Sequence, residues 1–280
     1  MGKDIIVSSI RPVRKASTSI RKYLEYVGTL LDIAGKRNSD IVCLPEDFAE
    51  LRERAQSSTG SVGTFIMPFA KKYKMYIIMP ISERYNEKNY ASAILIDRNG
   101  IVAGRYFKIH STPLEVKKFK ISRGNTIPVF QTDFGTIGIM ICFDSYFPEL
   151  PAILARKGAK IIFFPHQQNT PDPDTYMLHI RAHAMFNSVY IVASTWGTKS
   201  GDSWDPRSCY PSCIIGQDGN IIASSQKEEG VVTATIDVDR KWMVNGHAEP
   251  GIKDMRWIYK KYRRPDLYIK EDSEWSKFIK

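Results

Sequence analysis

No apolar run in this sequence of 280 residues approaches the length of about 18 residues that a membrane-spanning helix needs. The apolar stretch from Ile5 to Ile10 is short, and Arg11 follows it too soon for a signal peptide. Hydrophobic residues make up 43% of the chain and charged residues 25%, a composition ordinary for a soluble globular protein. We therefore expect a cytoplasmic protein without a membrane partner.

Cysteine is scarce, and none of the four cysteines, Cys43, Cys142, Cys209 and Cys213, belongs to a CxxC pair. Without an export signal, we expect reduced thiols rather than a disulfide framework. Cys209 and Cys213 stand four positions apart, but no matching His or Cys pair occurs at zinc-finger spacing. The sequence therefore predicts no metal site.

Several familiar catalytic and nucleotide-binding motifs are also missing. The chain has no GxSxG elbow, no phosphate-binding glycine loop and no dinucleotide fingerprint. Histidine is rare, and the positions of His110 and His183 do not favour a Cys–His catalytic pair. We interpret His110 as an orienting or packing residue, and His183 lies within a helical pattern.

Acidic residues are outnumbered by basic ones, and the formal net charge is +10. Such a balance can indicate a nucleic-acid partner. Here the Lys and Arg residues are spread along the chain among acids, and the densest cluster, Lys260 to Arg264, lies near the end. We favour a solvated face or a subunit contact for this cluster and expect no nucleic-acid partner. A steep salt dependence of binding to DNA or RNA would support the alternative.

Strand-like apolar runs alternate with helical patterns, which is typical of an α/β fold. The length allows one large domain, so we expect a single domain over residues 1–280 with a less regular, basic and aromatic tail from about residue 242. The expected strands cover about 5–7, 40–44, 76–79, 161–164, 190–193 and 231–236, the hairpins 93–103, 129–141 and 213–223, and the helices 20–34, 64–73 and 175–186.

Cys142 is the first candidate for chemistry. The apolar run 136–141 leads directly into it, and a helix is expected to begin near Pro148. A residue at the carboxyl end of a strand faces the crevice in which α/β proteins bind ligands. A nearby base or cation can convert a thiol there into a nucleophilic thiolate. The alternative is a small buried apolar residue, which is the common role of cysteine.

Glu46 and Lys108 are further candidates. Glu46 follows a buried strand and Pro45, so a desolvated carboxylate there could serve as a general base. Lys108 follows the expected hairpin 93–103, and a lysine beside a thiol would lower the thiol pKa and stabilise an oxyanion. Taken alone, Glu46 is better explained as a surface acid in a turn with Asp47, and Lys108 is better explained as an exposed lysine at a strand end.

Together these segments resemble the nitrilase superfamily of carbon–nitrogen hydrolases. Residues 44–46 resemble its glutamate motif, 106–110 its lysine motif and 141–149 its cysteine motif, in the right order along the chain. Weaker agreement comes from 181–184 with Asn187 on the later helix. Three motifs at these spacings are far more specific than any one of them.

The resemblance implies an α/β fold built as a two-layer β-sandwich with helices on both outer faces (αββα). It also implies that two subunits pair through helices into an αββα–αββα homodimer. The expected partner is a small amide-type substrate, and no metal or organic cofactor is expected.

The resemblance further implies a mechanism. Glu46 would be the general base, and Cys142 would attack the substrate carbon to form a thioester. Lys108 and the backbone N–H of Phe143 would hold the oxyanion. Glu115 matches a second glutamate that many members carry after the lysine motif, and we expect a supporting role for it.

The motif at the nucleophile also points to a branch of the family. True nitrilases tend to carry Cys-Trp-Glu, whereas this chain has Cys142-Phe143-Asp144, which resembles the amidase and N-carbamoyl hydrolase branches. We therefore expect hydrolysis of a small amide or N-carbamoyl compound. There are two alternatives. The chain could convert a nitrile to an acid and ammonia, or it could be a catalytically silent member of the family that acts as a binding protein.

Two departures from the family pattern concern the substrate pocket. Phe186 stands where relatives commonly have glutamate, and Ser145-Tyr146 replaces a pattern that ends in arginine. A substrate carboxylate would then need another partner. The candidates are Arg207, Arg123 and His166.

Overall fold

The computed structural model divides the chain into two compact units, Met1–Asp239 and Arg240–Lys280. The residues that it describes are 3–13, 19–51, 54–167, 173–197, 210–225, 230–245 and 250–275.

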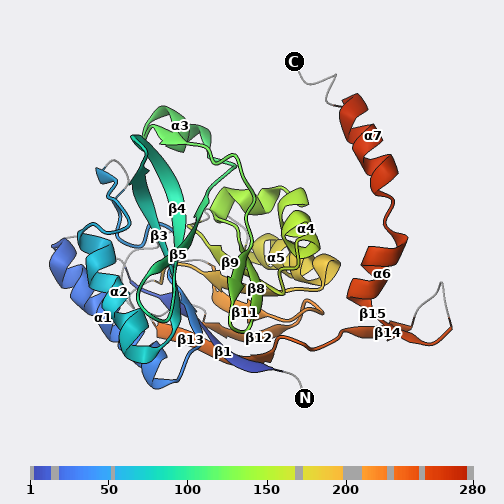
Figure 1. Cartoon of the computed structure of the whole chain (residues 1–280), viewed down its shortest axis with the longest axis horizontal. Helices are drawn as coiled ribbons and strands as arrows, with labels where there is room; N and C mark the ends of the chain where they lie inside the picture. The colour runs from blue at the N-terminus through green and yellow to red at the C-terminus, as the bar shows by residue number, and fades with distance from the viewer. Residues whose placement is uncertain are drawn as a thin grey trace. The chain divides into compact units, whose positions relative to one another are not determined.

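The first sheet of the larger unit consists of β1 (Asp4–Arg11), β2 (Ile41–Cys43), β3 (Tyr76–Tyr85), β4 (Lys88–Ile96), β5 (Val102–Phe107), β6 (Ile121–Ser122) and β13 (Gly230–Asp237). Its order is β13-β1-β2-β3-β4-β5, and the short β6 pairs with β4 (Figure 1). The central strands β1, β2 and β3 are parallel, while β13, β4 and β5 are antiparallel to their neighbours. The carboxyl ends of the central strands therefore meet at one edge of the sheet.

The second sheet consists of β7 (Phe130–Thr132), β8 (Gly135–Ile139), β9 (Ile161–Pro165), β10 (Tyr190–Ser194), β11 (Ser212–Ile215) and β12 (Ile221–Ser225). Its order is β12-β11-β10-β9-β8-β7. The neighbours β8, β9 and β10 are parallel, and the outer strands are antiparallel. Both sheets thus have parallel central strands, and the carboxyl ends of these strands can carry functional residues.

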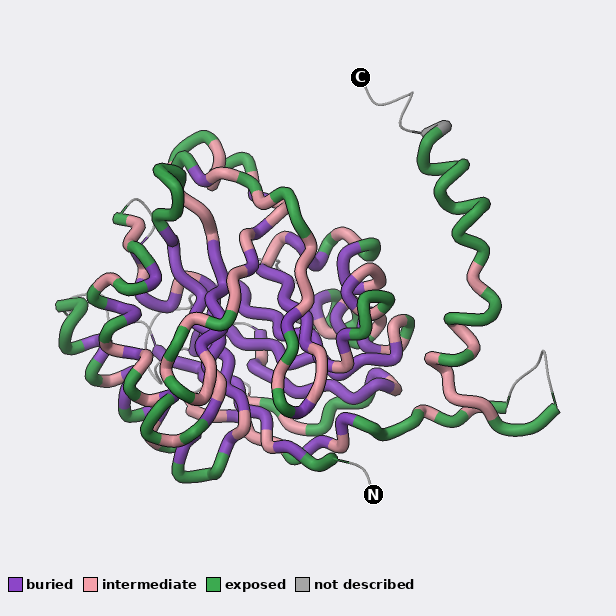
Figure 2. Tube along the Cα trace, in the orientation of Figure 1, coloured by how far each residue is buried: buried purple, intermediate pink, exposed green. Residues whose placement is uncertain are grey.

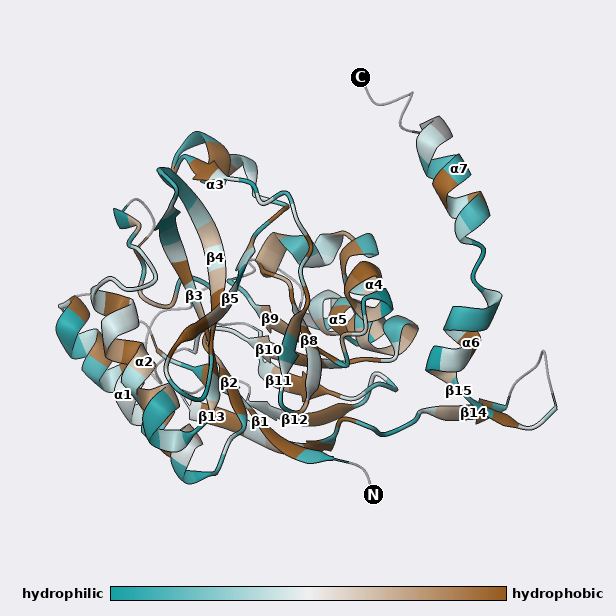
Figure 3. Ribbon diagram, in the orientation of Figure 1, coloured by the Kyte–Doolittle hydropathy of each residue, from teal (hydrophilic) through white to brown (hydrophobic). Residues whose placement is uncertain are grey.

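The inner faces of the two sheets share one hydrophobic core. Val7 from the first sheet and Ile139 and Phe163 from the second are completely buried in the same cluster. A polar contact also crosses between the sheets, because the Ser9 hydroxyl donates to the carbonyl oxygen of Ala193 at 2.8 Å. Figure 2 shows the strands of both sheets as largely buried, and Figure 3 shows hydrophobic residues concentrated along them.

Helices cover the outer faces: α1 (Ile20–Lys36) and α2 (Ser61–Tyr73) on the first sheet, α4 (Glu149–Arg156) and α5 (Pro173–Asn187) on the second. Val27 of α1 and Ile66 of α2 pack with Val42 of β2 in a second buried cluster. The predicted αββα arrangement is confirmed. Pairing into a dimer stays a prediction.

Helix α1 follows from its sequence. The Ser19 side chain accepts a hydrogen bond from the backbone N–H of Lys22 and caps the first turn. Leu24 and Leu31 recur at helical spacing and are buried, as predicted. Ile20, which belonged to the same predicted stripe, is instead 41% exposed at the first position of the helix.

The smaller unit has more regular structure than the sequence indicated. It contains the strands β14 (Met243–Asn245) and β15 (Ile252–Asp254) and the helices α6 (Met255–Tyr262) and α7 (Pro265–Trp275). The strands form a two-stranded antiparallel sheet, and the Asp254 side chain caps α6 by accepting from the N–H of Arg256. Across the described ranges, no helix is both long enough and apolar enough to cross a membrane.

Candidate active site

A cavity of ≈ 400 Å³ opens beside the carboxyl ends of β2 and β8. It is within the size range of small-molecule sites. Its described lining residues are Glu46, Asp47, Pro80, Ile81, Ser82, Ala91, Ser92, Lys108, Thr112, Leu114, Glu115, Phe119, Ile121, Ile141, Cys142, Phe143, Tyr146 and Gln167. All five predicted site residues, Glu46, Lys108, Glu115, Cys142 and Phe143, line this one cavity.

Glu46 follows β2, and two side chains hold its backbone carbonyl by hydrogen bonds. The Gln167 side chain donates to the Glu46 carbonyl oxygen at 2.6 Å, and Trp196 Nε1 donates to the same oxygen at 3.2 Å. Gln167 comes shortly after β9 and Trp196 shortly after β10. The edge of the second sheet therefore holds a residue that the first sheet supplies.

Lys108 directly follows β5 and continues its pairing with β4. Its N–H donates to the carbonyl of Ala91 at 2.9 Å, and its own carbonyl accepts from Gly124 at 2.9 Å. A Cβ atom at Gly124 would lie 2.2 Å from the carbonyl oxygen of Phe107, so this close approach requires glycine. The Lys108 backbone is thus locked, and its side chain is 1% exposed.

Cys142 does not continue a strand, and this corrects the predicted extent of the preceding run. Strand β8 ends at Ile139, and Cys142 begins a single turn of 3₁₀ helix, Cys142–Tyr146. The chain leaves the sheet because the Asp144 carboxylate accepts the N–H of Ile141 at 2.9 Å. Cys142 has φ of 44°, a left-handed conformation that costs energy for a residue with a side chain.

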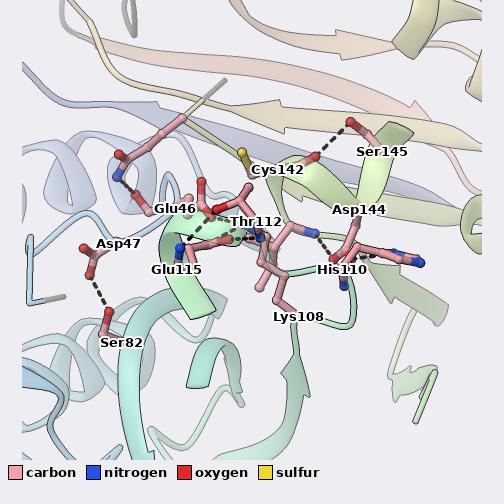
Figure 4. Close-up of polar contacts among 12 residues, drawn as sticks. Glu46, Asp47, Ser82, Lys108, His110, Thr112, Glu115, Cys142, Asp144 and Ser145 are labelled. Atoms are coloured by element: carbon pink, nitrogen blue, oxygen red, sulfur yellow. Dashed lines mark hydrogen bonds and ion pairs between the residues drawn. The ribbon is translucent and has the colours of Figure 1, made fainter. Parts of the chain in front are cut away.

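Three of these side chains form a buried charge cluster (Figure 4). Lys108 Nζ lies 2.8 Å from Glu46 Oε1 and 2.7 Å from Glu115 Oε1. Glu115 belongs to the short helix α3 (Pro113–Lys117), where it forms a capping box with Thr112. One Glu115 oxygen accepts from the N–H of Thr112 while the other faces Lys108. The helix cap therefore aims this carboxylate at the lysine.

The environment of Lys108 keeps its side chain charged. Burial alone would lower the Lys108 pKa, but the charges of Glu46, Cys142 and Glu115 raise it well above its ordinary value. Burial raises the pKa of Glu46, the nearby Glu115 carboxylate raises it further, and Lys108 opposes both. A carboxyl group with a raised pKa is a stronger base at neutral pH.

The cavity also keeps the Cys142 thiol protonated at rest. Burial raises the pKa of Cys142 well above its ordinary value and Glu46 adds to this, while Lys108 and the backbone N–H of Gln167 act in the opposite direction. The thiol hydrogen bonds to Glu46, which can take its proton. A thiol, a carboxylate and an ammonium in this arrangement can perform a covalent attack on a polarised carbon.

Asp144 connects the lysine segment to the cysteine turn. It is completely buried and accepts four hydrogen bonds: from the hydroxyl of Tyr106, from the N–H of Ile141, and from both the backbone N–H and Nδ1 of His110, at 2.7 to 3.0 Å. The His110 ring stacks on Phe147 with centroids 3.7 Å apart. The orienting role expected for His110 agrees with this position.

Two histidines that follow one another at helical spacing on α5 support the same turn. His179 Nε2 and His183 Nε2 both bond to the carbonyl oxygen of Ser145, the latter at 2.7 Å. A carbonyl can only accept, so both rings donate. Burial lowers the pKa of His183 to about 4, which leaves its ring neutral at pH 7. Beyond the four-residue spacing of the two histidines, no pattern in the chain indicates this contact.

Of the residues suggested for a substrate carboxylate, Arg123 and His166 are not part of the described lining of the cavity. His166 is completely buried, and the Tyr176 hydroxyl lies 2.6 Å from its Nε2. Arg207 and Cys209 lie outside the described residues. In the described part of the chain, no group of three or more His, Cys, Asp or Glu side chains could hold a metal ion.

Comparison with known proteins agrees with the sequence motifs. Residues 10–241 match the model of the carbon–nitrogen hydrolase family. The chain is 34% identical over 204 residues to a probable nitrilase of Schizosaccharomyces pombe, covering 71% of this chain and 70% of that one. It is also 32% identical over 213 residues to an N-carbamoylputrescine amidase of Solanum tuberosum, covering 69% of this chain and 67% of that one.

Solved structures share the fold. The crystal structure of a carbon–nitrogen hydrolase from Helicobacter pylori superimposes with a TM-score of 0.77 at 21% identity, covering 95% of this chain and 97% of that one. At this identity the likeness concerns the fold alone.

Proposed function

This chain belongs to the carbon–nitrogen hydrolase family, and we propose that it hydrolyses a small amide or N-carbamoyl compound through a thioester on Cys142. The observation that carries the proposal is the position of Lys108 between Glu46 and Glu115, in the same cavity as the Cys142 thiol. This cluster combines a base, a nucleophile and a fixed positive charge.

In the acylation half-reaction, Glu46 takes the thiol proton as Sγ of Cys142 attacks the substrate carbon. The carbonyl oxygen becomes an oxyanion, which the Lys108 ammonium and the backbone N–H of Phe143 stabilise. When this intermediate collapses, the carbon–nitrogen bond breaks and the proton held by Glu46 passes to the leaving nitrogen. Ammonia or an amine leaves, and a thioester remains.

In the second half-reaction, Glu46 removes a proton from a water molecule, which attacks the thioester carbon. The same oxyanion donors stabilise this second intermediate. Collapse releases the acid and returns the proton to the sulfur of Cys142, so that the enzyme is restored. For an N-carbamoyl substrate, the released acid is a carbamic acid, which loses carbon dioxide.

The raised pKa of Cys142 supports the need for a base. A thiol that is protonated at neutral pH cannot attack without losing its proton. Glu46 is the hydrogen-bonded acceptor, and its raised pKa suits it to proton transfer. Glu115 supports the reaction by holding Lys108 in place from the other side.

The amide reading is preferred over the nitrile reading because Phe143 and Asp144 follow the nucleophile, where nitrilases tend to carry Trp-Glu. The named relatives include both a probable nitrilase and an amidase of an N-carbamoyl amine. We further expect a homodimer, which the molar mass in solution would test.

The test is ammonia release from a panel of primary amides, N-carbamoyl amino acids, N-carbamoyl amines and nitriles, with the Cys142→Ala protein as control. We expect release from amides or N-carbamoyl compounds that requires Cys142. Release from nitriles alone would favour the nitrilase alternative. Cys142-independent release, or none from any class, would contradict the proposal, and the latter would favour a catalytically silent binding protein.

A further inference from the structure

Gln167 contacts residues that come from both sheets of the larger unit. It stands two residues after the end of β9 in the second sheet, and it lines the same cavity as Glu46 and Cys142. The first sheet supplies Glu46, which follows β2, and the second sheet supplies Cys142, which follows β8. The reaction as described above gives Gln167 no role, although its contacts reach both the base and the nucleophile.

The side chain of Gln167 holds the main chain of Glu46. Its Nε2 donates to the Glu46 carbonyl oxygen at 2.6 Å, a shorter bond than the one of 3.2 Å from Trp196 to the same oxygen. Pro45 precedes Glu46 and has no N–H, and residues 44–50 belong to no helix or strand. Bonds from outside this segment therefore determine where the Glu46 side chain begins.

The backbone of Gln167 lies at the sulfur. Its N–H hydrogen bonds to the Cys142 thiol, and the Glu46 side chain hydrogen bonds to the same thiol. One residue thus connects the Glu46 main chain to the Cys142 sulfur. Proton transfer from Sγ to the carboxylate requires the two groups to stay within hydrogen-bond reach. A misplacement of about 1 Å can cost roughly 10²-fold in rate.

The segment that carries Gln167 is itself firmly held. The N–H of His166 donates to the carbonyl oxygen of Ser194 at 2.9 Å, and the Tyr176 hydroxyl lies 2.6 Å from His166 Nε2. His166 is completely buried, and its ring stacks on Phe164 with centroids 4.6 Å apart. Gln167 therefore extends from a fixed point of the second sheet towards the base that the first sheet supplies.

We propose that Gln167 is a positioning residue, whose side chain sets the Glu46 carboxylate against the Cys142 sulfur and so determines how fast the thiol is activated. The inference rests on the proposed function, because it takes Glu46 as the base and Cys142 as the nucleophile. The side chain acts through Glu46 and not through a contact with the substrate.

Modification of Cys142 by methyl methanethiosulfonate at pH 8 tests this inference without an amide substrate. The sulfur attacks the reagent, methanesulfinate leaves, and a methyl disulfide forms on Cys142. Gln167→Met keeps the length of the side chain but removes the donor, and it should slow the modification by roughly tenfold, as expected for one lost hydrogen bond. Gln131→Met makes the same change at an exposed position on β7 and should leave the rate unchanged.

A double-mutant cycle with Glu46→Gln separates positioning from a general loss of structure. Glu46→Gln alone should slow the modification. Adding Gln167→Met to it should change the rate by less than about twofold, because no base remains to be positioned. A tenfold loss that recurs in the Glu46→Gln background would show a structural role and overturn the inference.

Trp196→Phe is a second variant, since it removes the other donor to the Glu46 carbonyl. Its loss should be smaller than that of Gln167→Met, because its bond is longer and Gln167 still holds the carbonyl, and it should also vanish in the Glu46→Gln background. A loss that persists in that background would count against positioning through Glu46.

Turnover gives a further readout. With an amide that the protein hydrolyses, Gln167→Met should lower kcat by roughly tenfold and leave KM within about twofold. A raised KM with an unchanged kcat would indicate a substrate contact and overturn the inference.

The outcomes also separate this inference from the proposed function. A modification rate that Glu46→Gln lowers and Gln167→Met does not would overturn the inference and keep the function. A rate that Glu46→Gln leaves unchanged would contradict the base itself.

Discussion

The ammonium nitrogen of Lys108 lies 2.8 Å from Oε1 of Glu46, and both side chains are almost completely withdrawn from solvent. The two residues are 62 positions apart in the sequence. Removing two charges from water is costly unless further polar contacts compensate for the loss. Glu115 provides such a contact by binding the same nitrogen at 2.7 Å. The arrangement is therefore expected to serve chemistry rather than stability.

The two glutamates should differ in their effect on turnover. Glu46→Gln removes the base and should slow acylation by at least about 10²-fold. Glu115→Gln leaves the base in place and should cause a smaller loss, because Lys108 keeps its contact with Glu46. Single-turnover kinetics with a good amide substrate measures both. Equal losses in the two variants would show that Glu46 has no separate role as a base.

Asp144 should matter for stability as well as for activity. Asp144→Ala leaves four donors without their acceptor: the buried Tyr106 hydroxyl and Ile141 N–H, and two N–H groups of the partly buried His110. We expect the free energy of unfolding to fall by about 3–5 kcal/mol. Urea denaturation measures this change. Asp133→Asn is the matched control, since its side chain is 53% exposed, and it should change stability by no more than about 0.5 kcal/mol.

Stability should depend on pH through His183. Its pKa is lowered to about 4 in the folded protein, against an ordinary value of 6.5. Between these values the unfolded chain binds more protons than the folded chain, so stability should fall as the pH drops from 6.5 towards 4. His183→Gln still offers a donor to Ser145 but cannot titrate, and it should reduce this loss by up to about 3 kcal/mol.

Urea denaturation of the wild type and of His183→Gln at several pH values measures the difference. His179 also has a lowered pKa and contributes to the remaining slope. An identical pH dependence in the two proteins would contradict the burial of a neutral His183 ring.

Much of the fold could be predicted because its signals are local. Apolar runs and helical spacing marked the central strands and the helices α1, α2 and α5 correctly. The end of β8 could not be predicted, since Ile139 to Ile141 are all apolar and the chain leaves the sheet only because Asp144 captures the N–H of Ile141. In the smaller unit β14, β15 and α6 have only three to eight residues each, too few for a pattern to stand out.

The site, like the fold, has some features that the sequence predicts and others that it does not. Family motifs indicated the residues that line the cavity, but not the contacts that hold them. The bonds from His179 and His183 to Ser145 join a helix to a turn more than thirty residues earlier in the chain. Their partner is a backbone carbonyl, which leaves no trace in the sequence.

The central claim is a thioester on Cys142, and mass spectrometry of the acid-quenched reaction tests it most directly. With a substrate that turns over, Cys142 should be acylated within one turnover, with Glu46 acting as the base and Lys108 stabilising the oxyanion. The added acyl mass should map to the peptide that contains Cys142, be absent from Cys142→Ala, and persist in Cys209→Ser. Turnover without any acyl mass on Cys142, or an acyl mass on another residue, would contradict the account.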